Sequence, residues 1–198
     1  MNIGLTGGIA CGKSTVSSLL VSRGAILIDA DQLAREVVLP GAPALDRVAG
    51  VFGQGVLHED GSLNRKQLGE LVFGNEEKRK QLEGLLHPPI RSLMKERMEE
   101  SERLFPDKLV VVDVPLLFES QMEDYFQEIM VVYASPDIQL QRLIGRDGFS
   151  EQEARKRLEA QIPIEWKKEW ADHLIDNSGP ITDTVEQVDS FWRRKGLA

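Results

Sequence analysis

The sequence contains few of the residues that build disulfide frameworks and metal clusters. Its 198 residues include one cysteine, Cys11, and three histidines. An intramolecular disulfide is therefore excluded, and no group of Cys and His ligands indicates a structural zinc site. The sequence also lacks any apolar run approaching the roughly 18 residues that a membrane helix needs, and its start does not resemble a signal peptide. We therefore expect a soluble, cytoplasmic protein that has no membrane partner.

Basic residues are outnumbered by acidic ones. The chain has 24 lysines and arginines against 32 aspartates and glutamates, which gives a net charge of −8. A broad basic surface for nucleic acid is therefore not indicated. The three tryptophans have no basic stripe beside them and do not make a base-stacking platform. The length suits one α/β domain with an insertion, and the oligomeric state stays open.

What the sequence does contain is a phosphate-binding motif near its start. Residues 7–14 read G-G-I-A-C-G-K-S and directly follow the apolar residues 1–5. A strand that ends in a glycine-rich turn and opens into a helix points several backbone N–H groups at one place, where the helix dipole adds positive charge. Lys13 can then reach the β- and γ-phosphates, and the Ser14 hydroxyl can bind Mg²⁺. The segment predicts a nucleoside triphosphate site; the structural alternative is a tight glycine turn with a surface lysine.

Cys11 lies inside this motif. The nearby helix N-terminus and Lys13 could lower the pKa of its thiol, and ATP would then protect it from alkylation. We favour the simpler interpretation that Cys11 is a small side chain filling a tight loop, because reactivity requires exposure.

Short apolar runs alternate with helical patterns along the chain. Strand-like runs occupy residues 3–6, 25–28, 109–114, 129–133 and 173–175. The alternation predicts an α/β fold with a mainly parallel sheet that helices cover on both faces. Ligands bind beyond the carboxyl ends of the strands in such sheets. We expect a nucleotide-binding core of residues 1–38 and 106–198.

Residues 39–105 interrupt the alternation. They contain helical patterns at 64–73 and 75–86 but no convincing strand, so we expect a helical insertion on the substrate side. Pro88 and Pro89 should kink or split the long helix there, because proline lacks a donor and clashes with the preceding turn. On sequence alone, His87 simply precedes that break.

Two carboxylates follow the second predicted strand. Asp29 can cap the next helix, with Gln32 three residues later as in a capping box, and the helix dipole favours Asp31 in the first turn. Asp31 and Arg35 also have the spacing of a surface ion pair. The functional alternative is that Asp31 receives the proton of a phosphoryl acceptor, and the phosphate loop favours this alternative.

Asp113 ends the apolar run of residues 109–114. An aspartate at this place in a phosphate-loop protein supports Mg²⁺, often through water, beside the loop Ser or Thr. We favour that role over a turn-forming aspartate before Pro115.

Two arginines, Arg142 and Arg146, share one face of a predicted helix. Like charges at this spacing are unfavourable unless an anion lies between them, although Asp147 or Glu151 could also pair with them on a solvated face. Glycines at positions 145 and 148 could give hinge freedom to a lid, which we expect over residues 142–165.

Several segments together resemble the dephospho-coenzyme A kinase family, and the resemblance runs nearly from end to end. The segments are L-T-G-G-I at 5–9, G-K-S-T at 12–15, I-D-A-D at 28–31, A-R at 34–35, P-G at 40–41, L-H-P at 86–88, P-L-L-F-E at 115–119 and I-D-N at 175–177. The chain departs from the commonest family loop at Ala10 and Cys11, where Gly-Ser is more familiar. Both substitutes are small, so we expect altered loop flexibility rather than lost binding.

The resemblance implies a P-loop kinase fold with a five-stranded parallel sheet, a helical substrate-binding domain and a lid. It also implies direct in-line transfer of the γ-phosphoryl group of ATP, with Mg²⁺, to the ribose 3′-hydroxyl of 3′-dephospho-CoA, the last step of CoA synthesis. The ATP site would contain Gly7, Gly8, Ala10, Cys11, Gly12, Lys13, Ser14 and Thr15. Catalysis would use Asp31 as the base with Lys13, Arg142 and Arg146. The acceptor would contact Thr6, Asp31, Arg35, His87 and Leu116, and the metal would contact Ser14 and Asp113.

Two other classes stay open. Another small-molecule or nucleotide kinase of the same fold would share the loop and differ in the helical insertion. A GTP-dependent switch or regulatory ATPase would share it too, although the sequence has no N-K-x-D guanine-reading tetrad. A nucleic-acid-binding module is the weakest alternative, given the acidic composition.

Overall fold

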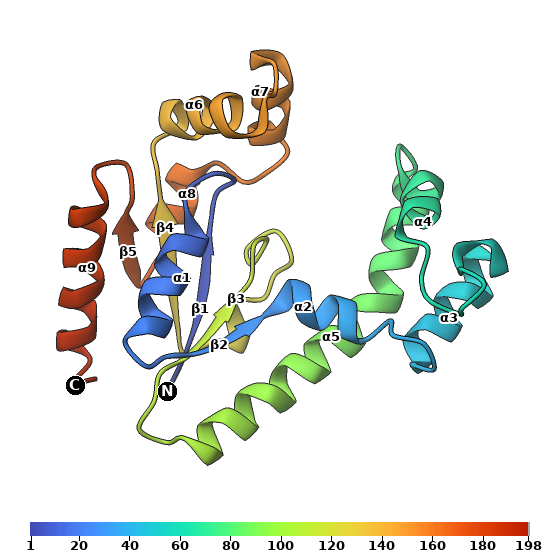
Figure 1. Ribbon diagram of the computed structural model, residues 1–198, viewed down its shortest axis with the longest axis horizontal. Coiled ribbons are helices and arrows are strands. Elements are labelled where there is room, and N and C mark those ends of the chain that lie inside the picture. Colours follow the sequence, from blue (N-terminus) through green and yellow to red (C-terminus); the bar gives the residue numbers. More distant parts are fainter. Residues whose placement is uncertain (198) are drawn as a thin grey trace. The chain divides into compact units, whose positions relative to one another are not determined.

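The computed structural model describes residues 1–197, which form two compact units (Figure 1). The first unit comprises Met1–Ile28 and Met98–Ala198, and the second comprises Asp29–Arg97. The second unit starts where the second strand ends, and it contains most of the helical insertion expected at residues 39–105.

The first unit is built on a five-stranded sheet with the order β2-β3-β1-β4-β5. The strands are β1 Asn2–Gly7, β2 Ile26–Asp29, β3 Val110–Asp113, β4 Glu128–Tyr133 and β5 His173–Asp176. β1 pairs in parallel with β3 and β4, and β4 pairs in parallel with β5. Every predicted strand is present, and no strand end differs from its predicted position by more than one residue. Parallel strands collect their carboxyl ends at one edge, which is where ligands bind in such sheets.

Helices cover this sheet. The first unit contains α1 Lys13–Ser22, η2 Glu123–Tyr125, α6 Pro136–Asp147, α7 Glu151–Glu159, α8 Ile164–Glu169 and α9 Ile181–Arg194. α9 packs against both α1 and β5, and α8 packs against β4 (Figure 1). The central strands are consequently buried: Ile3, Leu5 and Val111 have no exposed surface. Burial on both faces explains why these strands are continuous apolar runs rather than alternating ones.

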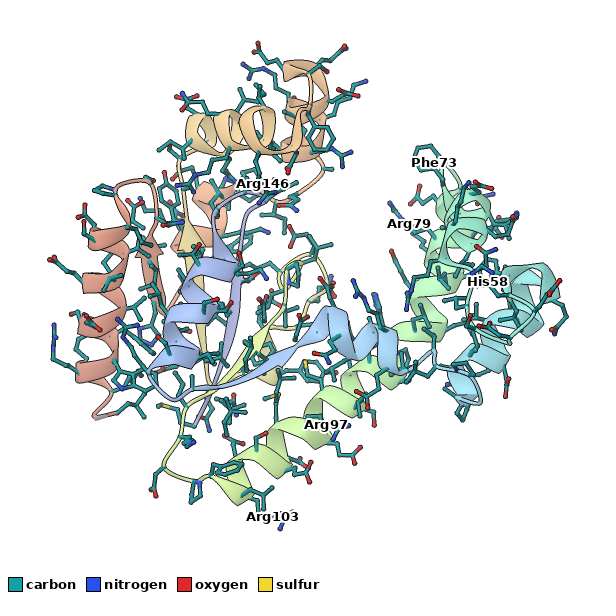
Figure 2. All side chains as sticks on the ribbon, in the orientation of Figure 1. His58, Phe73, Arg79, Arg97, Arg103 and Arg146 are labelled. Atoms are coloured by element: carbon teal, nitrogen blue, oxygen red, sulfur yellow. The ribbon has the colours of Figure 1, made fainter. Side chains whose placement is uncertain are left out.

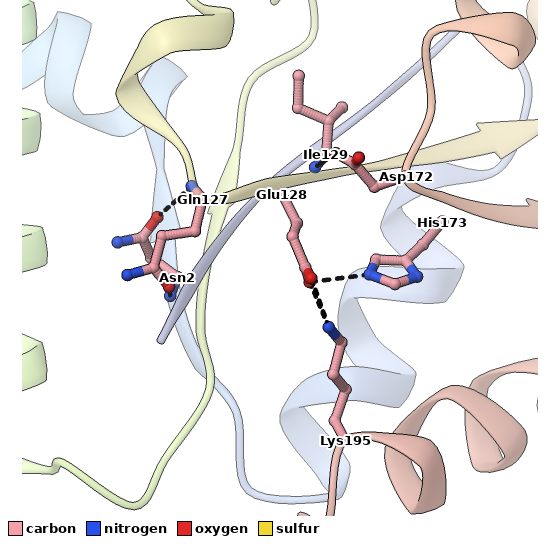
Figure 3. Close-up of polar contacts among 7 residues, drawn as sticks. All are labelled: Asn2, Gln127, Glu128, Ile129, Asp172, His173 and Lys195. Carbon is pink, nitrogen blue, oxygen red and sulfur yellow. Dashed lines mark hydrogen bonds and ion pairs between the residues drawn. The ribbon is translucent and has the colours of Figure 1, made fainter.

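Polar side chains connect neighbouring strands at the end of the sheet away from the carboxyl ends, where β1, β4 and β5 begin (Figure 3). Lys195, at the end of α9, donates to Glu128 over 2.6 Å, and His173 Nε2 lies 2.9 Å from the same carboxylate. Asp172 accepts a hydrogen bond of 2.8 Å from the Ile129 N–H. These contacts fix the C-terminal helix to the start of β4.

The second unit is helical. It contains α2 Ala30–Glu36, α3 Pro43–Phe52, η1 Gln54–Val56, α4 Arg65–Val72 and most of α5 Glu76–Leu104. One cluster gathers Val48, Ala49, Val56 and Leu68, and a second gathers Val37, Val38 and Leu45. Leu57, Leu63 and Leu86 pack against both clusters, so the unit has a core of its own.

The long helix α5 decides between the two effects predicted for its prolines, a kink or a split. Pro88 and Pro89 lie inside it, and the helix bends without being split (Figure 1). Leu82 and Leu85 pack against the first cluster, whereas Ile90 and Leu93 pack against the second. Because apolar packing holds the helix on both sides of the prolines, it outweighs the local loss of a backbone hydrogen bond.

Within residues 1–197, no helix has the combined length and apolar character needed to cross a bilayer.

Candidate active site

The predicted phosphate loop connects β1 to α1. Gly12 precedes the first residue of α1 and has a φ of 86°, a left-handed conformation that glycine adopts without steric cost. The Thr15 N–H donates to the Gly12 carbonyl over 3.0 Å, which starts the helix at this point. Helix α1 therefore directs its N-terminal N–H groups beyond the carboxyl end of β1, as the motif predicted.

A cavity of about 270 Å³ lies on this loop. It is lined by Gly7, Gly8, Ile9, Ala10, Gly12, Lys13, Ser14, Pro115, Arg146 and Gln161. The lining combines backbone N–H groups of the loop, the N-terminus of α1 and two cationic side chains. That combination suits a polyanion such as a chain of phosphates.

Lys13 and Asp113 form an ion pair at this cavity. Asp113 is the last residue of β3, and β3 lies beside β1 with Asp113 in register with Leu5. The parallel pairing thus carries the predicted metal-site carboxylate to the predicted phosphate-binding lysine. Both side chains are largely buried, which strengthens their interaction relative to a surface pair.

A second cavity, of about 650 Å³, adjoins the first. The two share Ala10, Gly12, Ser14 and Arg146, and the second adds Thr15, Arg142, Gly145, Asn177, Gly179 and Ile181. The first has a lining that suits phosphates, and the second has the volume for a bulkier group. Sequence reasoning did not assign a role to the segment after β5, although its position at a strand's carboxyl end was a signal for one.

The two arginines of α6 have different surroundings. Arg142 is half-buried and donates to the backbone carbonyls of Ala10, Cys11 and Asn177 over 3.2, 3.4 and 2.7 Å. Arg142 therefore holds the backbone of the phosphate loop in place. The sequence predicted a catalytic role for Arg142 and did not predict this structural one. Arg146 lies on the last turn of α6 with its side chain 69% exposed (Figure 2). It forms two hydrogen bonds with Asp147, and this pairing raises the pKa of Arg146.

Asn177 and Lys167 also hold the loop, and neither was assigned a role from the sequence. The Asn177 amide donates to the Cys11 carbonyl over 2.8 Å and accepts from the Thr184 hydroxyl. Lys167 has no exposed side-chain surface, and its ammonium lies 2.7 Å from Glu119 and 3.5 Å from the Gly7 carbonyl. A buried lysine needs such a partner, because an isolated charge in the interior is strongly unfavourable.

The two residues that depart from the commonest family loop lie differently from their neighbours. Ala10 has a φ of 60°, in the left-handed region that a non-glycine residue rarely adopts. Cys11 is fully buried, and burial raises the pKa of its thiol to about 11. The favoured interpretation of Cys11 as a packing residue therefore agrees with its surroundings, because a buried neutral thiol is a poor nucleophile.

The remaining predicted residues of the first unit are Thr6 and Leu116. Thr6 is fully buried, and its hydroxyl donates to the Pro115 carbonyl over 3.2 Å. It therefore supports Pro115, which lines the phosphate cavity, and the contact of Thr6 with the acceptor stays a prediction. Leu116 is 43% exposed.

In the second unit, Asp29 caps α2 by accepting from the N–H groups of Asp31 and Gln32. Asp31 and Arg35 are both exposed on α2, and within residues 1–197 they form no ion pair with each other. Asp29 is thus the capping residue of α2, and the Asp31 carboxylate takes no part in the cap. His87 is half-buried within α5.

Comparison with known proteins gives a consistent result. The family model described as dephospho-CoA kinase matches residues 1–183. A dephospho-CoA kinase from Shouchella clausii is 48% identical over 188 residues, which are 95% of each chain. A crystal structure from Thermus thermophilus aligns with a TM-score of 0.82 at 31% identity and covers 98% of this chain and 97% of its own. A dephospho-CoA kinase structure from Campylobacter jejuni aligns with a TM-score of 0.68 at 31% identity, covering 98% and 96%.

Proposed function

This chain belongs to the dephospho-CoA kinase family, and from that premise we infer that it carries out the last step of CoA biosynthesis. It is an ATP-dependent phosphotransferase that moves the γ-phosphoryl group of ATP to the ribose 3′-hydroxyl of 3′-dephospho-CoA and releases CoA and ADP. A cytoplasmic location, where ATP is plentiful, goes with this proposal.

The observation that carries the donor part is the pair of adjoining cavities at the phosphate loop. Phosphates in the smaller cavity would meet the loop N–H groups and the N-terminus of α1. The adenosine in the larger cavity would then lie between the Arg142 side and the segment of residues 177–181. The four lining residues that the two cavities share support the proposal that one nucleotide occupies both.

Within that site, Lys13 and Arg146 supply the charge that the transfer requires. In phosphoryl transfer the enzyme contributes mainly positioning and electrostatic stabilisation, because negative charge spreads over the transferring group. Lys13 would exchange part of its interaction with Asp113 for the β- and γ-phosphates. Arg146 is exposed at the end of α6 and would leave Asp147 to contact the same group.

The acceptor part rests on Asp31. Asp31 is exposed in the first turn of α2, and Asp29 already caps that helix. We assign Asp31 the role of orienting the 3′-hydroxyl and accepting its proton as the oxygen attacks the γ-phosphorus in line. Arg35, His87 and Leu116 would bind the acceptor, and residues 39–105 would form most of its binding domain.

The residues at the loop also suit Mg²⁺. Ser14 is exposed in the first turn of α1 and lines both cavities, and Asp113 lies at the end of β3 beside Lys13. Within residues 1–197 there is no group of three or more His, Cys, Asp or Glu that would form a complete metal cage. This fits Mg²⁺, which keeps several waters and substrate phosphates as ligands. When bound, the ion would neutralise phosphate charge beside Ser14 and Asp113.

An assay of ADP release tests the assignment of both substrates. We expect ADP with Mg-ATP and 3′-dephospho-CoA, and little with adenosine monophosphate as the acceptor or with GTP as the donor. Preferred phosphorylation of adenosine monophosphate would indicate another nucleotide kinase of this fold. Hydrolysis of GTP without any acceptor would indicate a switch or regulatory protein.

A further inference from the structure

Both polar groups of one phosphate-loop residue, Ile9, are bound by glutamine side chains. The Ile9 N–H donates to Gln161 Oε1 over 2.9 Å. The Ile9 carbonyl accepts from Gln139 Nε2 over 2.7 Å. Gln139 is 3% exposed and Ile9 is half-buried, so the bond between them is partly shielded from water.

The two glutamines come from either side of helix α7. Gln139 belongs to the first half of α6 (Pro136–Asp147), and Gln161 follows α7 (Glu151–Glu159) by two residues. α6 and α7 pack against each other. The segments that enter and leave α7 are therefore both attached to the same residue of the loop.

Two further observations connect these amides to the phosphate site. Gln161 lines the phosphate cavity itself, together with Arg146. A Cβ atom on Gly8 would lie 2.3 Å from Gln139 Nε2, so the amide occupies space that any side chain at position 8 would fill. The lack of a side chain at Gly8 thus makes room for the Gln139 amide near the phosphate cavity.

We propose that Gln139 and Gln161 are positioning residues of the donor site: by holding the Ile9 N–H and carbonyl together, they fix the shape of the loop that binds the nucleotide phosphates. Removing either glutamine leaves one polar group of the half-buried Ile9 without its partner, and the loop then moves to find another. The proposal rests on the inferred ATP site, and it concerns nucleotide affinity rather than acceptor binding.

The test compares Gln139→Leu, Gln161→Leu and the double variant with two matched controls. Gln141→Leu changes an exposed glutamine of α6, and Gln152→Leu changes an exposed glutamine of α7. ATP affinity would be measured by calorimetry, the Ile9 amide by ¹⁵N NMR, and folding by thermal unfolding. The KM for each substrate would follow from steady-state kinetics.

We expect each single variant to bind ATP about 3- to 10-fold more weakly, as the loss of one hydrogen bond predicts. The double variant should lose less than the product of the two effects, because both glutamines act on one residue. The Ile9 amide signal should move in Gln161→Leu, the KM for 3′-dephospho-CoA should not change, and both controls should match the wild type.

Unchanged ATP affinity in Gln161→Leu, with a displaced Ile9 signal, would overturn the proposal, and so would fully multiplicative effects. Gln161 is only partly buried, so this variant keeps the test decisive even if Gln139→Leu fails to fold. Failure of the wild-type chain itself to bind ATP would instead overturn the inferred function on which the proposal rests.

Discussion

Replacing Ala10 with glycine should lower the stability of the protein very little or raise it, against the usual effect of such a change. Ala10 has a φ of 60°, and the left-handed region costs alanine roughly 1–2 kcal/mol, which glycine avoids. Glycine's greater freedom in the unfolded chain opposes this gain by about 0.4–1 kcal/mol. Loss of a half-buried methyl group opposes it by about 0.4 kcal/mol more. The net effect should lie between a loss of about 0.4 kcal/mol and a gain of about 1.2 kcal/mol.

Ala160→Gly is the matched control, because Ala160 has an ordinary φ of −75° and is exposed. Without strain to relieve, this variant should lose about 0.5–1 kcal/mol. Urea unfolding followed by tryptophan fluorescence would measure both, since all three tryptophans lie in the unit that contains Ala10 and Ala160. If Ala10→Gly destabilises the protein as much as Ala160→Gly does, the reasoning about strain at position 10 is wrong.

Three further predictions follow from the site and the sheet. Asp31→Asn should keep ATP affinity while kcat falls by roughly 10² to 10⁴, as expected for loss of a general base; calorimetry and steady-state assays would check this, and near-normal turnover would remove Asp31 from the role. The Lys195 and His173 contacts lower the pKa of Glu128, so this carboxylate stabilises the fold at neutral pH and loses that effect as acid protonates it in the folded state. Glu128→Gln should therefore flatten the acid limb of stability against pH, and an unchanged slope would contradict the contact. Cys11, buried with its thiol pKa raised to about 11, should react equally slowly with iodoacetamide at pH 8 with and without ATP, whereas strong protection by ATP would show that the thiol is exposed in the free protein.

The sheet could be predicted because its strands are buried on both faces. A short continuous apolar run, such as the one ending at Asp113, is typical of a strand in a parallel sheet that helices cover on both faces. The phosphate loop was predictable for a different reason: its glycines, lysine and serine must occur in a fixed local order for the chemistry to work. The resemblance to the family then indicated the acceptor substrate, which the spacing of the residues alone did not.

Contacts between distant segments could not be read from the chain. Lys167, Gln139 and Gln161 look like ordinary helix and loop residues, and only the fold brings them to the backbone of the loop. The sequence left open whether Pro88 bends α5 or splits it, for a related reason. The local penalty of proline is visible in the sequence, whereas the packing of Leu85 and Ile90 that offsets it depends on tertiary structure.

The identity of the reaction product tests the central claim most directly. The protein would be incubated with Mg-ATP and 3′-dephospho-CoA, and the product analysed by mass spectrometry and by ³¹P NMR. The account predicts a product heavier by one phosphate, with a new monophosphate signal at the ribose 3′ position and one ADP formed for each product molecule. Formation of ADP with 3′-dephospho-CoA left unchanged, or phosphate attached at another position, would contradict it.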